Sequence, residues 1–92
     1  MAEEEQKRKD IRVRATFPIS KKGPYETTDP RDTTVGTVLG AAMKHFEVEN
    51  DRQFTYVLAF DGEEQNPSTD IGTVAGDKDE VRFTLVKKIT QG

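Results

Sequence analysis

The chain contains no cysteine, which excludes disulfide bonds, thiolate metal sites and a cysteine nucleophile. Such a composition fits a cytoplasmic protein. Lys and Arg number 14 against 17 Asp and Glu, so the net charge is −3 and the basic excess typical of nucleic-acid-binding proteins is missing. No apolar run approaches the roughly 18 residues of a membrane-spanning segment. We therefore expect neither nucleic acid nor a membrane as a partner.

Groups that could carry out chemistry are also sparse. The single histidine, His45, lies off the apolar stripe of a predicted helix and has no nucleophile near it in sequence, so we expect a surface residue and no catalytic base. The acidic stretch 77–80 lacks the glycine and the distal glutamate of a calcium loop, and Glu63-Glu64 is interpreted in the same way as a solvated turn. No phosphate-binding glycine motif occurs. The sequence thus predicts no catalysis, no cofactor and no metal.

The strongest periodic segment is residues 33–48, which predicts an amphipathic helix. Thr33 or Thr34 can cap its start, and Asn50 is a candidate for a left-handed residue after its end. Gly36 and Gly40 are interpreted as surface glycines or as a close approach to a neighbouring loop, with a docking groove as the alternative. The stripe that should face the core contains Val35, Val38, Leu39, Ala42, Met43 and Phe46.

The remaining apolar segments alternate with the period of two that half-buried strands show. Asp61-Gly62 is a tight-turn signal, and Ile71 with Val74 suggests a short helical turn. The first and last strands should form a central parallel pair, since the connection between them carries the helix. Strands are predicted over residues 11–17, 25–28, 54–60 and 81–85.

In this order the elements predict a single α+β domain, a ββαββ mixed sheet with one helix packed across it. The domain should cover residues 11–89 as a monomer. Residues 1–10 are expected to form a disordered, charged N-terminal tail, because they are polar and have no periodicity. Residues 90–92 are expected to form a flexible C-terminal tail.

Several segments in order resemble the ubiquitin-like β-grasp family over residues 11–92. The marks are the hairpin IRVRATFPISKKGPYETT, the helix entrance DTTVGTV, the strand and turn TYVLAFDG, the crossover DIGTV, and a last strand that ends in a basic segment and a glycine. The resemblance implies the β-grasp fold.

The same resemblance implies two roles, which the sequence leaves open. The first is a non-catalytic protein-interaction domain, recognised by an unidentified protein through the outer sheet face, where Val57, Ala59, Thr84 and Val86 would lie. The second is a modifier or sulfur carrier that an activating enzyme would adenylate at Gly92. In the family, modifiers end in two glycines, whereas this sequence ends Thr-Gln-Gly.

Overall fold

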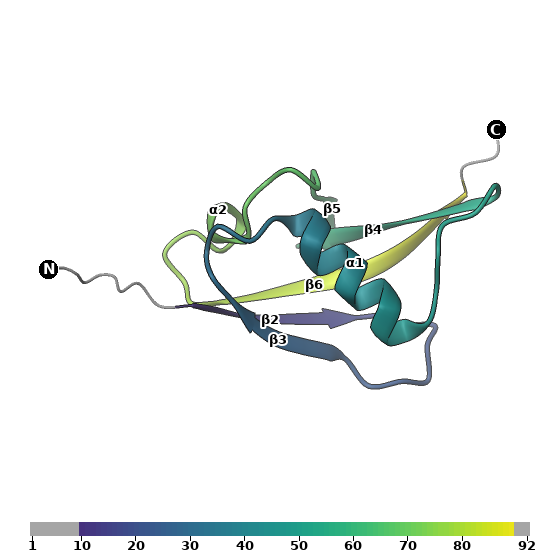
Figure 1. Cartoon of the computed structure of the whole chain (residues 1–92), viewed down its shortest axis with the longest axis horizontal. Helices are drawn as coiled ribbons and strands as arrows, with labels where there is room; N and C mark the ends of the chain where they lie inside the picture. The colour runs from purple at the N-terminus through teal and green to yellow at the C-terminus, as the bar shows by residue number, and fades with distance from the viewer. Residues whose placement is uncertain (1–9, 90–92) are drawn as a thin grey trace, which may run out of the picture.

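The computed structural model describes residues 10–89, which form a sheet with a helix lying across one of its faces (Figure 1). The five strands follow the order β3-β2-β6-β4-β5. The elements, in chain order, are β2 (Ile11–Thr16), β3 (Tyr25–Asp29), α1 (Val35–Phe46), β4 (Phe54–Phe60), β5 (Glu63–Glu64), α2 (Ile71–Ala75) and β6 (Glu80–Ile89). The predicted tails, residues 1–10 and 90–92, lie outside the described residues except for Asp10.

The pairing of the strands confirms the predicted mixed sheet. β2 and β6 are parallel and adjacent in the middle of the sheet, while β3 pairs antiparallel with β2, and β4 pairs antiparallel with β6. The last strand is longer than predicted, because β6 continues until Ile89 pairs with Phe54. At this end the ammonium group of Lys87 lies 4.0 Å from the centre of the Phe54 ring, a cation–π contact that helps to hold a polar strand segment in the sheet.

The structure contains one strand that the sequence did not predict, and the predicted helical turn around Ile71 is a short helix. Asp61 and Gly62 both have positive φ, 55° and 85°, so the chain reverses immediately after β4. The returning pair Glu63–Glu64 forms β5 beside β4, and two residues are too few to show an alternating pattern. The helical turn expected around Ile71 is α2.

Helix α1 begins as predicted and ends earlier. The hydroxyl of Thr34 accepts a hydrogen bond from the amide of Thr37 at 3.2 Å, which makes Thr34 the N-cap. The left-handed residue after the helix is Glu47, with φ of 62°, so the prediction for Asn50 is wrong. The side-chain oxygen of Asn50 instead accepts a hydrogen bond from the amide of Tyr56 at 2.9 Å, and so supports the entry into β4.

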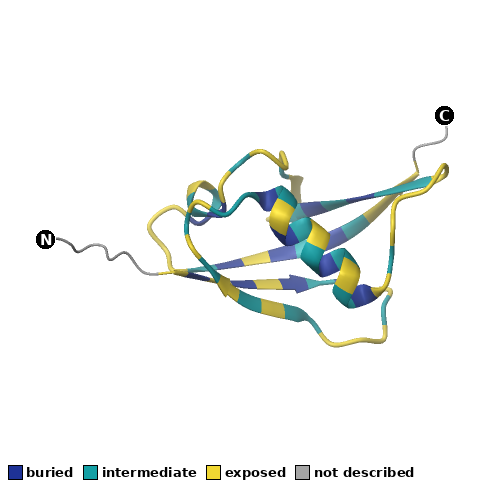
Figure 2. Cartoon of the chain, viewed as in Figure 1, coloured by how far each residue is buried: buried dark blue, intermediate teal, exposed yellow. Residues whose placement is uncertain are grey.

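The core lies between α1, α2 and the sheet, and Figure 2 shows how buried and exposed residues alternate along the strands. The buried side chains among residues 10–89 are hydrophobic, and Tyr56 is the one among them that carries a hydroxyl. Leu39 and Met43 of the predicted stripe are only half-buried, because they lie at the flank of the helix face that meets the sheet. The buried helix residues are Val35, Val38, Ala42 and Phe46.

The two helix glycines differ in their surroundings. The amide of Gly36 donates a hydrogen bond to the carbonyl of Pro67 at 2.8 Å, and a Cβ at Gly36 would lie 3.1 Å from the same oxygen. Gly36 is therefore a close approach to a neighbouring loop, one of the two interpretations offered by the sequence. A Cβ at Gly40 would meet nothing within 4 Å, so Gly40 is an open surface position.

Candidate functional site: the outer face of the sheet

The four predicted interaction residues lie next to each other on the face of the sheet opposite α1. Val57 of β4 is directly paired with Val86 of β6, and Ala59 is directly paired with Thr84. Directly opposed residues in an antiparallel pair bring their Cβ atoms to about 4.5–5.5 Å. The four side chains therefore form one continuous surface, which we call the outer patch.

The alternation of the strands places these residues on the outer face. Tyr56 and Leu58 are buried against the helix side, so Val57 between them must point outward. In β6, Phe83 and Leu85 are buried in the same way, which leaves Thr84 facing outward. All four members of the outer patch are intermediate in exposure, as expected for short side chains between neighbours in a sheet.

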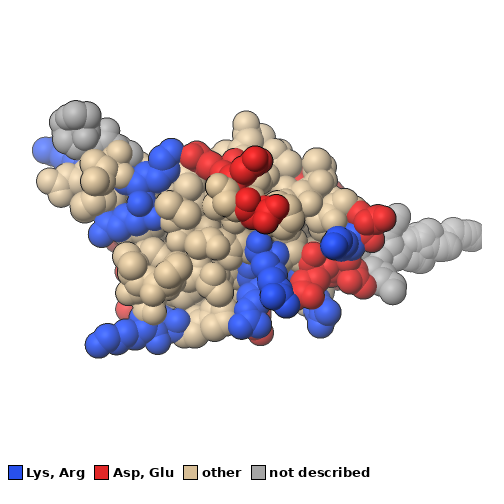
Figure 3. Space-filling model, turned by 180° about the vertical axis from the view of Figure 1, so that it is seen from behind, with Lys and Arg blue, Asp and Glu red and all other residues tan. Residues whose placement is uncertain are grey.

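Charged side chains surround the outer patch. Figure 3 shows this face as an uncharged area bordered by groups of lysine and arginine, with acidic side chains gathered at the upper border and at the right of the view. At the β5 edge, the ammonium group of Lys88 lies 2.7 Å from a carboxylate oxygen of Glu64. Toward β2, the parallel register places Arg14 beside Arg82 and Thr16 beside Thr84. The outward direction of these arginines follows from the sequence, but their juxtaposition depends on the parallel register of two strands far apart in the chain.

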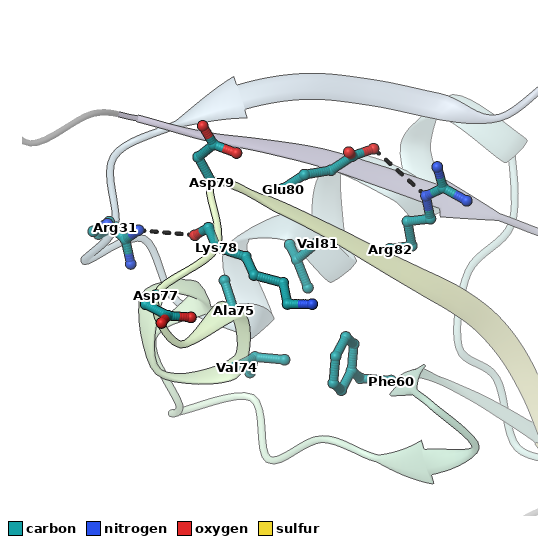
Figure 4. Close-up of a pocket in the computed structure, with 10 residues that line it drawn as sticks. All are labelled: Arg31, Phe60, Val74, Ala75, Asp77, Lys78, Asp79, Glu80, Val81 and Arg82. Carbon is teal, nitrogen blue, oxygen red and sulfur yellow. Dashed lines mark hydrogen bonds and ion pairs between the residues drawn. The ribbon is translucent and has the colours of Figure 1, made fainter.

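Apart from the outer patch, a hollow lies between α2 and the start of β6 (Figure 4). Phe60 and Val74 form part of its wall, and the charged residues Asp77 and Lys78 also line it. Beside it, the guanidinium of Arg31 donates hydrogen bonds to the carbonyls of Gly76 at 2.9 Å and Lys78 at 2.8 Å. Arg31 thereby ties the loop that precedes α1 to the loop that follows α2. This role has no local signal in the sequence, because the residues it joins are more than 40 positions apart.

A third group of residues connects the loop between β2 and β3 (residues 17–24, the hairpin loop) to the end of α1. The Nε2 atom of His45 lies 3.0 Å from the carbonyl of Gly23, and since a carbonyl oxygen can only accept, this nitrogen carries the hydrogen. The ammonium group of Lys22 donates to the carbonyl of His45 at 3.0 Å and to the carboxylate of Glu47 at 2.8 Å. The hydrogen bond and the charge of Lys22 lower the pKa of Glu47. His45 is half-buried and holds the hairpin loop, and is thus more enclosed than the expected surface residue.

Residues 10–89 contain no group of three or more His, Asp or Glu side chains that could hold a metal ion. No helix in this part of the chain is long and apolar enough to cross a membrane. The predicted attachment residue Gly92 lies outside the described residues.

Comparison with solved structures identifies the fold. The chain is similar to ubiquitin from Caldiarchaeum subterraneum, with a TM-score of 0.70 and 17% identity over 90% of this chain and 99% of that one. It is similar to ATG8 from Trypanosoma brucei, with a TM-score of 0.68 and 16% identity over 96% of this chain and 81% of the other. An N-terminal ubiquitin-like domain gives a TM-score of 0.65 and 20% identity over 100% of this chain and 88% of that one. The sequence matches no family model and no curated protein.

The chain therefore has the ubiquitin-like β-grasp fold, in the α+β class. Identities of 16–20% establish the fold alone, and many functions share it. A protein partner is the general expectation for such a domain. Which surface meets the partner has to be argued from this chain's own residues.

Proposed function

We propose that the protein is a non-catalytic ubiquitin-like interaction domain in the cytoplasm, and that it binds a protein partner as a monomer through the outer patch. The observation that carries the proposal is the pairing of Val57 with Val86 and of Ala59 with Thr84 on a sheet face that no described element covers. Sheet faces of this kind offer a flat surface with a small apolar centre and a charged rim, the usual anatomy of a protein interface.

The distribution of ionisable groups supports a binding role over catalysis. Catalytic groups usually lie in a cleft where burial and neighbouring charges displace their pKa. Among residues 10–89 the buried side chains include no acid or base, and the phenol of Tyr56 is the one buried ionisable group. The pKa of Glu47 is lowered by the hydrogen bond and the charge of Lys22, and this pair is exposed to solvent. This pair serves the hairpin loop and lies on the helix side of the molecule.

The proposal is tested with a charged side chain placed in the outer patch. We would express Val57→Lys and a matched control, Thr28→Lys, in the native cell and compare the proteins that co-purify with each. Thr28 is exposed and lies on the same sheet face, but on the edge strand β3. A partner that Val57→Lys loses and Thr28→Lys keeps supports the proposal. Equal recovery with both variants would refute the outer patch as the binding surface.

A further variant in the same experiment tests the second role, that of a modifier or sulfur carrier activated at Gly92. Deleting Gly92 removes the carboxylate that an activating enzyme would adenylate, and leaves residues 10–89 unchanged. If the protein is an interaction domain, the deletion variant keeps its partners and the intact protein has a single unmodified mass. A covalent adduct or a C-terminal thiocarboxylate in the intact mass, lost on deletion of Gly92, would establish the carrier role instead.

A further inference from the structure

Three arginines lie beside the outer patch and share two carboxylates. Arg14 and Arg82 are direct neighbours on the parallel strands β2 and β6, and Arg12 is the direct neighbour of Glu80. Like charges placed directly opposite each other destabilise a sheet unless a counter-charge lies between them.

The ion pairs show which guanidinium is least satisfied. Arg14 lies 3.2 Å from a carboxylate oxygen of Glu26. Glu80 is divided between two arginines, with one oxygen 3.7 Å from Arg12 and the other 3.5 Å from Nε of Arg82. These five side chains comprise three cations and two carboxylates. The Arg82 side chain is 75% exposed, and among residues 10–89 only its Nε is engaged.

The exposed guanidinium of Arg82 lies at a hollow that is continuous with the outer patch. Arg14, Thr16, Arg82, Phe83 and Thr84 line this hollow, and Thr84 belongs to the outer patch as well. Two guanidinium groups and two threonine hydroxyls give the hollow several hydrogen-bond donors on one side of the patch. Guanidinium groups bind carboxylates with two parallel hydrogen bonds, which fixes the direction as well as the charge of the ligand.

At the opposite side of the patch, the lysine that could bind an anion is already paired with a carboxylate. Lys88, the cation at that side, already has Glu64 at 2.7 Å, a shorter contact than any made by the three arginines. A segment that binds across the outer patch would therefore meet the sparsely paired guanidinium of Arg82 at its Arg14–Arg82 end. This asymmetry gives the bound segment a direction.

We propose that the occupant of the outer patch is a protein segment in which one Asp or Glu stands beside aliphatic residues. The aliphatic residues pack on Val57, Ala59 and Val86, while the carboxylate binds between Arg14 and Arg82 and accepts from the adjacent threonine hydroxyls. One carboxylate is assigned because one guanidinium, that of Arg82, has both terminal nitrogens without a partner among residues 10–89. This inference rests on the proposed function, since it names the chemistry of the partner at the same surface.

The test is a selection of random 16-residue peptides displayed on phage against the chain of residues 1–92. A parallel selection against Val57→Lys removes peptides that bind elsewhere. Peptides that need Val57 are expected to be enriched in Asp or Glu next to aliphatic residues. Arg82→Glu should weaken each of them by about tenfold or more, and Arg82→Gln by less, because binding is governed by charge at a partly exposed site. Selection against Arg82→Glu should enrich Lys and Arg instead.

The matched control is Lys21→Glu, which makes the same change in net charge at an exposed position of the hairpin loop. Its peptide affinities should stay within about threefold of the unmodified chain, since exposed charges far from the site are screened by salt. Urea unfolding of each variant excludes a loss of folding as the cause.

The outcomes separate the two proposals. Peptides that need Val57 but show no acidic enrichment, or bind Arg82→Glu as well as the unmodified chain, overturn this inference and leave the proposed function intact. A selection that yields no Val57-dependent peptide overturns both. A synthetic peptide in which phosphoserine replaces the acidic residue should bind no more than tenfold tighter. A larger gain would overturn the assignment of a carboxylate in favour of a phosphorylated segment.

Discussion

Replacement of Gly72 by alanine tests how tightly the loop before α1 is packed against α2. A Cβ at Gly72 would lie 2.9 Å from the Cβ of Arg31 and 2.9 Å from its carbonyl oxygen. The same carbonyl accepts a hydrogen bond from the Gly72 amide at 2.9 Å. The new methyl group must therefore displace backbone, and any displacement lengthens this hydrogen bond.

The expected magnitude combines three effects. An extra methyl group in a packed contact costs about 1–3 kcal/mol, and a weakened hydrogen bond adds about 0.5–1.5 kcal/mol. Alanine in place of glycine in a helix returns about 1 kcal/mol. We expect Gly72→Ala to lower the free energy of unfolding by about 2 kcal/mol, which corresponds to a fall in Tm of about 10 °C for a domain of this size.

The assay is equilibrium unfolding in urea, with the two glycines of α1 as internal references. At Gly40 a Cβ meets nothing, so Gly40→Ala should raise the free energy of unfolding by about 1 kcal/mol. At Gly36 the nearest contact, 3.1 Å from the carbonyl of Pro67, is tight but less severe, and the gain and the cost should nearly cancel. If Gly72→Ala were as stable as Gly40→Ala, the close packing of Arg31 on α2 would be refuted.

Three further predictions concern the core, the Arg31 contact and pH. Leu58→Ala, at a fully buried position of β4, should lower the free energy of unfolding by about 2–5 kcal/mol in urea; a loss below 1 kcal/mol would contradict its burial. Arg31→Met keeps the aliphatic stem but removes the donors to the loop carbonyls; it should cost about 1 kcal/mol and speed amide exchange in residues 76–79, and unchanged exchange would exclude the tie. Lys22 lowers the pKa of Glu47 in the folded protein. The pairing therefore stabilises the protein fully at pH values above the pKa that a glutamate has in the unfolded chain. This stabilisation is lost as the pH falls through the lower pKa of Glu47 in the folded protein. Lys22→Gln should therefore be less stable than the unmodified chain at pH 7 and closer to it at pH 3, and a difference that stays constant across this range would disprove the contribution.

The elements with a clear period were predictable because their burial is one-sided. The alternation in β2 and β4 and the apolar stripe of α1 each record which face meets the core, and the cap at Thr34 is a local hydrogen bond. Features that leave no periodic pattern in the sequence were either not predicted or predicted at the wrong residue. The two-residue strand β5 is too short for a pattern, and the end of α1 falls at Glu47 because the backbone turns left-handed there despite the absence of Gly or Asn.

For the candidate site, too, some features were predictable from the sequence and others were not. That Val57, Ala59, Thr84 and Val86 face away from the helix was readable from the period of two, and so was the outward direction of the arginines. Which outward residues become neighbours depends on register, and register between β2 and β6 is set by how α1 and the long connection fold over the sheet.

The sequence by itself thus determined the secondary structure that carries the β-grasp and the composition of each sheet face, since both follow from local periodicity and burial. Only the tertiary structure decided that Arg14 stands beside Arg82, that Arg31 reaches across to the loop after α2, and that Lys22 and His45 hold the hairpin loop. These contacts join residues 22 or more positions apart. They depend on the simultaneous packing of the helix and sheet, for which no short stretch of sequence carries a signal.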